Sequence, residues 1–155
     1  MTQERKFQIG VIGAGTCTPE EAQDAYIVGW EIAGRGAVLV CGGLGGVMEA
    51  ACHGSKDAGG TTVGIVPTSR KEDANPYVDI VIVTNMGHAR NAIVVNSSDI
   101  LIAVAGEYGT LCEIALGLKM EKTIVSLEGG WDIEGLVTAK SPGLAVETAF
   151  RTLLQ

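Results

Sequence analysis

Short apolar runs alternate with longer segments of helical periodicity along the chain. The runs are rich in Val and Ile and apolar at both odd and even positions, which is typical of strands buried on both faces of a parallel sheet. They predict strands at Ile9–Ile12, Ala37–Cys41, Thr62–Val66, Asp79–Val83, Ile100–Ala105 and Thr123–Leu127. The segments between and after them predict helices near Pro19–Gly34, Val47–Ala58, His88–Asn96, Thr110–Met120 and Gly143–Leu154.

This alternation indicates an α/β fold, namely a Rossmann-like, doubly wound parallel sheet with helices on both faces. The first helix has the clearest start. Thr18 can cap it, Pro19 suits its first position, and Glu21 completes a capping box. No linker, repeat or low-complexity tract interrupts the pattern, so we expect residues 1–155 to form a single domain.

Three glycine turns each follow a predicted strand and precede a predicted helix. Ligands of such sheets bind beyond the carboxyl ends of the strands, where glycine admits a ligand to the backbone and a helix N-terminus offers free amides. The turns therefore predict a site for a nucleotide or another phosphorylated ligand, although close packing of strand against helix would also favour glycine. In chain order the turns are Gly13–Gly15, Gly42–Gly46 and Gly106–Thr110. Their predicted ligand-binding residues are Gly13, Gly15, Gly43, Gly45, Gly46, Gly106, Gly109 and Thr110.

Composition narrows the classes of partner. The net charge is −7 and aromatic residues make up 5% of the chain, which disfavours duplex and single-strand nucleic-acid binding. The four cysteines are scattered and the two histidines lack metal-ligand spacing, so we expect no metal site. No apolar run is long enough for a membrane helix or a signal segment, and we expect a cytoplasmic protein.

Common nucleotide fingerprints fail in this chain. Thr18 stands where a dinucleotide-binding motif has its third glycine, and Cys41 stands where the second strand would end in an acidic residue. Neither a phosphate-loop G-x-x-x-x-G-K-[ST] motif nor a G-x-S-x-G nucleophile elbow occurs. These absences disfavour NAD binding, nucleoside triphosphate hydrolysis and serine-based hydrolysis.

Arg90 and Glu113 are the candidate chemical groups. Both follow strands near helix starts, so both are expected at the same sheet edge, where a carboxylate could act as a general base and a guanidinium could hold an anion. Alternatives stay open, because Thr110 and Glu113 also fit a capping box and Arg90 could pair with a surface acid. Trp131, after the last predicted strand, fits packing, a subunit contact or a ligand wall.

The glycine segments carry a family resemblance over nearly the whole chain. Val40–Ala51 (VCGGLGGVMEAA), Ala58–Gly60 and Gly64–Pro67 resemble the first half of the LOG-like ("lysine decarboxylase-like") Rossmann superfamily. Met86–Asn91 and Gly106–Glu113 resemble its second half. The GGLGGVMEAA and GxARN patterns are most similar to the molybdenum-cofactor carrier branch. The resemblance therefore implies molybdopterin cofactor as a carried ligand.

Another branch of this superfamily cleaves the N-glycosidic bond of cytokinin riboside 5′-monophosphates. By this resemblance Arg90 and Glu113 take the positions of its catalytic arginine and glutamate. The residues that match the enzyme's 5′-phosphate loop are Gly106, Gly109 and Thr110. The residues that match its opposing glycine loop are Gly43, Gly45 and Gly46. Three residues depart from the enzymatic pattern: Ala105 replaces a proline, Glu107 a glycine and Asn91 a lysine.

Two functions follow as hypotheses. The favoured one is a binding or carrier protein for a small anionic phosphorylated ligand, either molybdopterin cofactor or a nucleotide. The alternative is a nucleoside 5′-monophosphate phosphoribohydrolase that uses Glu113 and Arg90. The resemblance also implies a homodimer or higher homo-oligomer, for which Ala89–Val95 and Ile114–Met120 are candidate contact segments.

Overall fold

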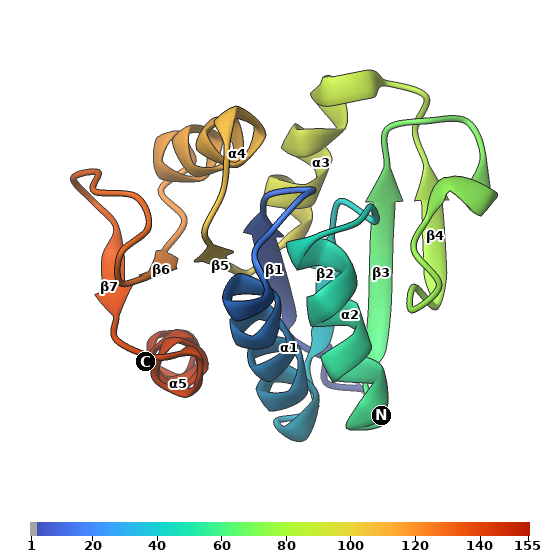
Figure 1. Ribbon diagram of the computed structural model, residues 1–155. Coiled ribbons are helices and arrows are strands. Elements are labelled where there is room, and N and C mark those ends of the chain that lie inside the picture. The colour runs from blue at the N-terminus through green and yellow to red at the C-terminus, as the bar shows by residue number, and fades with distance from the viewer. Residues whose placement is uncertain (1–2) are drawn as a thin grey trace.

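The computed structural model describes residues 3–155 and contains one all-parallel sheet of seven strands in the order β4-β3-β2-β1-β5-β6-β7 (Figure 1). The strands are β1 (Gln8–Gly13), β2 (Val38–Cys41), β3 (Thr61–Val66), β4 (Ile80–Val83), β5 (Ile100–Val104), β6 (Ile124–Leu127) and β7 (Val137–Ala139). The predicted α/β fold class is confirmed. The strand order reverses between β1 and β5, which makes their carboxyl ends the switch point where such sheets bind ligands.

Helices cover both faces of the sheet, with α1, α2 and α5 on one face and α3 and α4 on the other (Figure 1). Their bounds are α1 (Pro19–Gly34), α2 (Val47–Asp57), α3 (Asn91–Ser97), α4 (Tyr108–Lys119) and α5 (Pro142–Leu153). Two short 3₁₀ helices, η1 (Lys71–Asp73) and η2 (Gly87–Arg90), precede β4 and α3 respectively. No helix in residues 3–155 is long and apolar enough to cross a bilayer.

The buried strand β5 shows how the two-sided core arises. Ile100 and Ile102 pack into the cluster beneath α1, α2 and α5, whereas Leu101 and Ala103 pack into the cluster beneath α3 and α4. Successive side chains of a strand point to opposite faces, so a strand covered on both sides needs apolar residues at every position. This is why the sequence shows continuous apolar runs.

Capping fixes the first helix as predicted. The Thr18 hydroxyl accepts from the Glu21 N–H at 3.1 Å, and the Glu21 carboxylate accepts from the Thr18 N–H at 3.4 Å. α1 begins at Pro19 and ends at Gly34, the two predicted boundaries. This fixed start sets the direction in which the chain leaves the turn after β1.

Three elements differ from the sequence prediction. The predicted helix near His88–Asn96 is divided into η2 and α3. α4 begins at Tyr108 and not at Thr110. The strand β7 was not predicted, because its three residues are too few to show a periodic pattern; it pairs with β6 at the edge of the sheet.

Candidate ligand-binding site

The glycine turns after β1, β2 and β5 lie side by side at one edge of the sheet, because β1 is flanked by β2 and β5. The first two turns are joined directly, since the Val47 N–H donates to the Ala14 carbonyl across 3.0 Å. The first and third meet where Gly13 pairs with Val104. The turns therefore converge at the switch point, as the alternation of strands and helices predicted.

Packing explains some of the predicted glycines. An added Cβ would lie less than 3.0 Å from a neighbouring atom at Gly13, Gly43, Gly46 and Gly106. At Gly13 that neighbour is the Val104 carbonyl oxygen at 2.4 Å, and at Gly46 it is the Ala14 carbonyl oxygen at 2.3 Å. Gly13 and Gly46 therefore hold neighbouring turns against each other, and close packing accounts for all four glycines without a ligand.

The other predicted ligand-binding glycines, Gly15, Gly45 and Gly109, lie in more open surroundings. An added Cβ at Gly15 or Gly109 would have no neighbour within 4 Å, and one at Gly45 would have only the Gly15 carbonyl oxygen at 3.4 Å. Gly109 is the second residue of α4, so its N–H is among the first amides of a helix, which have no intrahelical partner. Gly109 adds no side chain of its own at the start of the helix, so these amides are candidate donors to a ligand oxygen.

Arg90 lies at the end of η2 and is 8% exposed. Its Nη2 donates to the Gly42 carbonyl across 3.4 Å, and its Nη1 donates to Asn91 Oδ1. The Nε–H is buried and has no hydrogen-bond partner among residues 3–155. A buried donor left unpaired costs about 1–3 kcal/mol, so the Nε–H marks a position where an acceptor would be stabilising. Burial lowers the pKa of Arg90, and the charge of Glu113 opposes that change.

Glu113 lies in α4 and is 7% exposed. Burial raises the pKa of its carboxyl to about 7, while the nearby Arg90 charge acts to lower it. Within residues 3–155 the carboxylate forms no salt bridge at 4.0 Å or less. A carboxyl with a pKa near neutrality can give or take a proton at physiological pH, which makes Glu113 a candidate acid–base group.

The capping box between Thr110 and Glu113, one explanation that the sequence allowed, does not form. α4 begins two residues before Thr110, so Glu107 is the N-cap, and no side chain caps the helix. Thr110 is buried and packs against Gly106. Arg90 likewise forms no surface ion pair, because it is buried. Helix capping and surface pairing therefore do not explain either residue.

Cys41 ends β2 directly before the second glycine turn. Its Sγ lies 3.5 Å from Cys52 Sγ of α2 and accepts the Gly43 N–H across 3.3 Å. The hydrogen bond with Cys52 lowers the pKa of Cys41 and raises that of Cys52. The thiol thus holds the second turn in place. No spacing in the sequence indicated this contact, because it depends on how α2 packs on β2.

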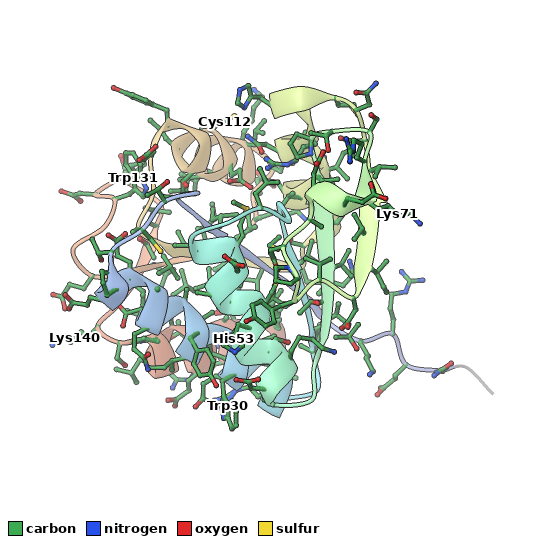
Figure 2. The ribbon with its side chains drawn as sticks, turned by 45° about the vertical axis from the view of Figure 1, so that its right-hand side comes forward. Trp30, His53, Lys71, Cys112, Trp131 and Lys140 are labelled. Carbon is green, nitrogen blue, oxygen red and sulfur yellow. The ribbon has the colours of Figure 1, made fainter. Side chains whose placement is uncertain are left out.

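A cavity of about 700 Å³ opens at the first and third turns, bounded by α1 and by the loop after β6. Trp131 lies in its wall, at the end of the molecule where Cys112 of α4 also lies (Figure 2). Among the described residues, no Lys, Arg or His lines the cavity.

The acidic residues that line the cavity are Glu20, Glu21, Asp24, Glu107 and Glu128. Burial and the charges of Glu20 and Glu21 raise the pKa of Asp24. This acidic lining disfavours the anionic part of a ligand, and neither Arg90 nor Glu113 lines the cavity.

Sequence reasoning placed Arg90 and Glu113 correctly at one edge, but it missed three of their neighbours. Asn91, Gly42 and Cys41 each contact Arg90 or shape the turn beside it. Asn91 was noted only as a replacement for lysine. The position of Asn91 directly after Arg90 was the one feature of the sequence that could have indicated their contact. The acidic residues of α1 showed no such signal, since charged residues near a helix start are ordinary surface features.

The fold and its converging turns define a Rossmann-like protein with a glycine-lined edge at the switch point. The chain belongs to the SLOG cluster4 family, whose family model matches residues 6–149. It is 54% identical over 141 residues to an uncharacterized protein of Archaeoglobus fulgidus, covering 90% of this chain and 92% of that one. It is 31% identical over 147 residues to the cytokinin riboside 5′-monophosphate phosphoribohydrolase LOG of rice, Oryza sativa, covering 85% of this chain and 60% of the rice protein.

Solved structures of molybdenum cofactor proteins are similar over nearly their whole length. The molybdenum cofactor binding protein of Rippkaea orientalis superposes with a TM-score of 0.92 at 38% identity, covering 99% of this chain and 100% of that one. The molybdenum cofactor carrier protein of Chlamydomonas reinhardtii superposes with a TM-score of 0.88 at 35% identity, covering 97% and 100%. The resemblance to the LOG-like superfamily, near its molybdenum-cofactor carrier branch, is confirmed.

Proposed function

We propose that the protein binds and carries a small anionic phosphorylated ligand, either molybdopterin cofactor or a nucleotide, at the edge formed by the three glycine turns. The observation that carries this proposal is the buried, unpartnered Nε–H of Arg90. It lies next to the second turn, through the contact of Arg90 with Gly42. The likeness to two molybdenum cofactor proteins supports molybdopterin cofactor as the ligand.

In this proposal, Arg90 and the start of α4 bind the anionic part of the ligand, and the acidic cavity binds its ring. An anionic oxygen accepts from the Arg90 Nε–H and from the free amides at the start of α4, which Gly109 leaves uncovered. The acidic cavity beside the third turn repels phosphate. Its carboxylates can accept hydrogen bonds from ring N–H groups, which both pterins and nucleobases carry. The anionic and ring parts of the ligand are thereby directed to different places.

Mass spectrometry of the small molecules that co-purify with the protein tests this proposal. We expect one phosphorylated ligand in a near-stoichiometric amount, and a mass matching molybdopterin or its cofactor would identify the cargo. The control is the Gly109→Val variant, which should retain the fold and lose the ligand. Wild-type protein that copurifies with no ligand and binds neither AMP nor inorganic phosphate would contradict the proposal.

The second candidate function is hydrolysis of nucleoside 5′-monophosphates. The proximity of Glu113 and Arg90 favours it, because glycosidic cleavage needs a carboxylate near the ribose and a group that stabilises developing charge. The backbone at Ala105 weighs against it: φ is +54° there, whereas proline, which the enzymatic motif has at this position, is held near −65°. The third turn therefore has a different conformation from any turn with proline at this position.

Chromatography of AMP after incubation with the protein distinguishes the two functions, because a hydrolase releases adenine and a carrier does not.

We further propose that the protein is a cytoplasmic homo-oligomer. The edge strand β4 supports assembly, since Ile80, Ile82 and Val83 are 52%, 43% and 41% exposed. Exposed apolar residues on an edge strand favour pairing with another chain. These apolar side chains of β4 are more exposed than most of those in Ala89–Val95 and Ile114–Met120, the contact segments expected from the sequence. We therefore propose β4 as the contact surface in place of those segments.

A further inference from the structure

The guanidinium of Arg90 is held by two neutral acceptors. Nη1 donates to the side-chain amide of Asn91, and Nη2 donates to the backbone carbonyl of Gly42. Gly42 also makes room for the group, because an added Cβ there would lie 2.8 Å from Nη2. Each terminal nitrogen thus makes a hydrogen bond, whereas Nε is buried and has no hydrogen-bond partner in residues 3–155.

Asn91 makes this contact in an unusual position. It is 3% exposed and directly follows Arg90, and both residues have helical backbone angles. Neighbouring residues of a helix do not ordinarily face each other, so their contact requires a particular pair of side-chain rotamers. The amide of Asn91 is thus turned to the guanidinium inside the protein.

The neutrality of Asn91 matters as much as its position. A carboxylate in its place would form a stronger hydrogen bond to the guanidinium, but it would cancel the positive charge that attracts an anion. An amide oxygen orients the same group and leaves its charge in place. Glu113 opposes this charge only partly, since it forms no salt bridge with Arg90 at 4.0 Å or less.

We propose that Asn91 is a positioning residue that, together with Gly42, fixes the Arg90 guanidinium so that its Nε–H donates to an anionic oxygen of the ligand. The second half of this statement, that the Nε–H donates to the ligand, is the ligand half and rests on the proposed binding function. The first half, that Asn91 and Gly42 fix the guanidinium, is the positioning half and concerns the protein alone. The two halves can therefore be tested separately.

Nitrogen-15 NMR of the arginine side chains tests the positioning half without any ligand. Arg90 is the one buried arginine in residues 3–155, so its Nε–H signal should be narrow and slow to exchange, and Arg90→Lys assigns it by its loss. We expect Asn91→Ala to broaden or displace this signal and Asn91→Asp to retain it. Asn96→Ala, an exposed position of the same helix, is the matched control and should change nothing.

Calorimetric titration with AMP and with inorganic phosphate tests the ligand half. We expect Asn91→Ala to weaken binding about tenfold, the scale of one hydrogen bond to a charged group. Asn91→Asp should weaken it at least as much although the NMR signal persists, because the added charge neutralises Arg90. If Asn91→Ala does not fold, Gly42→Ala displaces the same guanidinium and should have the same two effects.

The outcomes separate the two halves. An unchanged Arg90 Nε–H signal in folded Asn91→Ala would overturn the positioning role. Tight binding of the anion by Asn91→Asp would overturn the argument from charge. A wild-type protein that shows the protected signal but binds neither probe would contradict the proposed function and leave the positioning role standing.

Discussion

Arg90 and Glu113 lie close enough for each to oppose the pKa shift of the other, yet no salt bridge of 4.0 Å or less joins them. Both are more than nine-tenths buried. A direct ion pair would occupy N–H donors of the guanidinium and oxygens of the carboxyl, whereas this separation leaves both groups able to bind a third group. The pair is therefore better suited to a ligand than to holding the fold together.

Glu113→Gln should remove a pH dependence from stability. Because burial raises the pKa of Glu113 from 4.5 to about 7, the unfolded chain ionises this carboxyl first as pH rises. Stability then falls between pH 4.5 and about 7 and levels off above, by roughly 3 kcal/mol in total. We expect the variant to be more stable than the wild type at pH 8 and to match it near pH 4 in urea unfolding.

The control for this prediction is Glu72→Gln, which removes an exposed carboxylate. It should leave the difference in stability between pH 4 and pH 8 as it is in the wild type. A pH profile of Glu113→Gln that follows the wild type throughout would show that Glu113 ionises normally in the folded protein.

Gly109→Val should abolish ligand binding and leave the fold intact. The new side chain would extend into open space and cover the free amides at the start of α4. Calorimetry with AMP is the measurement, and circular dichroism checks the fold. Gly34→Val, equally open but at the far end of α1, should bind like the wild type. Equal affinity of the two variants would remove Gly109 from the site.

Ala105 offers a test of the third turn. Its φ of +54° is unfavourable for alanine and impossible for proline, so Ala105→Gly should stabilise the protein by about 0.5–1 kcal/mol. Ala105→Pro should destabilise it by more than about 1 kcal/mol and distort the turn. Thermal unfolding measures both. A stable Ala105→Pro variant with AMP hydrolase activity would show that the turn can adopt the enzymatic conformation.

Ile82→Lys should shift the protein toward the monomer. Ile82 lies on the exposed edge strand β4, and a lysine there blocks edge-to-edge pairing. We expect light scattering at micromolar concentration to show at least a dimer for the wild type and a smaller species for the variant. A monomeric wild type would contradict the proposed assembly, and an unchanged oligomer in the variant would place the contact elsewhere.

Patterns that depend on neighbouring residues in the chain were readable from the sequence. The capping box at Thr18 and Glu21 predicted the start of α1, Gly34 predicted its end, and the continuous apolar runs predicted the buried strands. β7 escaped prediction because three residues show no period. The start of α4 was misplaced because its N-cap residue, Glu107, makes no side-chain cap hydrogen bond and so carries no start signal.

The candidate site was readable only in part. Topology alone brings Arg90 and Glu113 to one edge, since both follow strands that end there. Their burial, the unpaired Nε–H and the amide of Asn91 depend on side-chain packing between β2, η2 and α4, which no periodicity encodes. The same limit applies to the acidic cavity, whose carboxylates come from separate segments of the chain.

Native mass spectrometry, before and after incubation with AMP, tests the carrier function most directly. We expect the purified protein to hold a phosphorylated ligand through Arg90 and the glycine turns, and AMP, where it binds, to remain intact without release of adenine. A ligand-free protein that steadily releases adenine from AMP, and loses that activity in Glu113→Gln, would contradict the carrier function and establish the hydrolase.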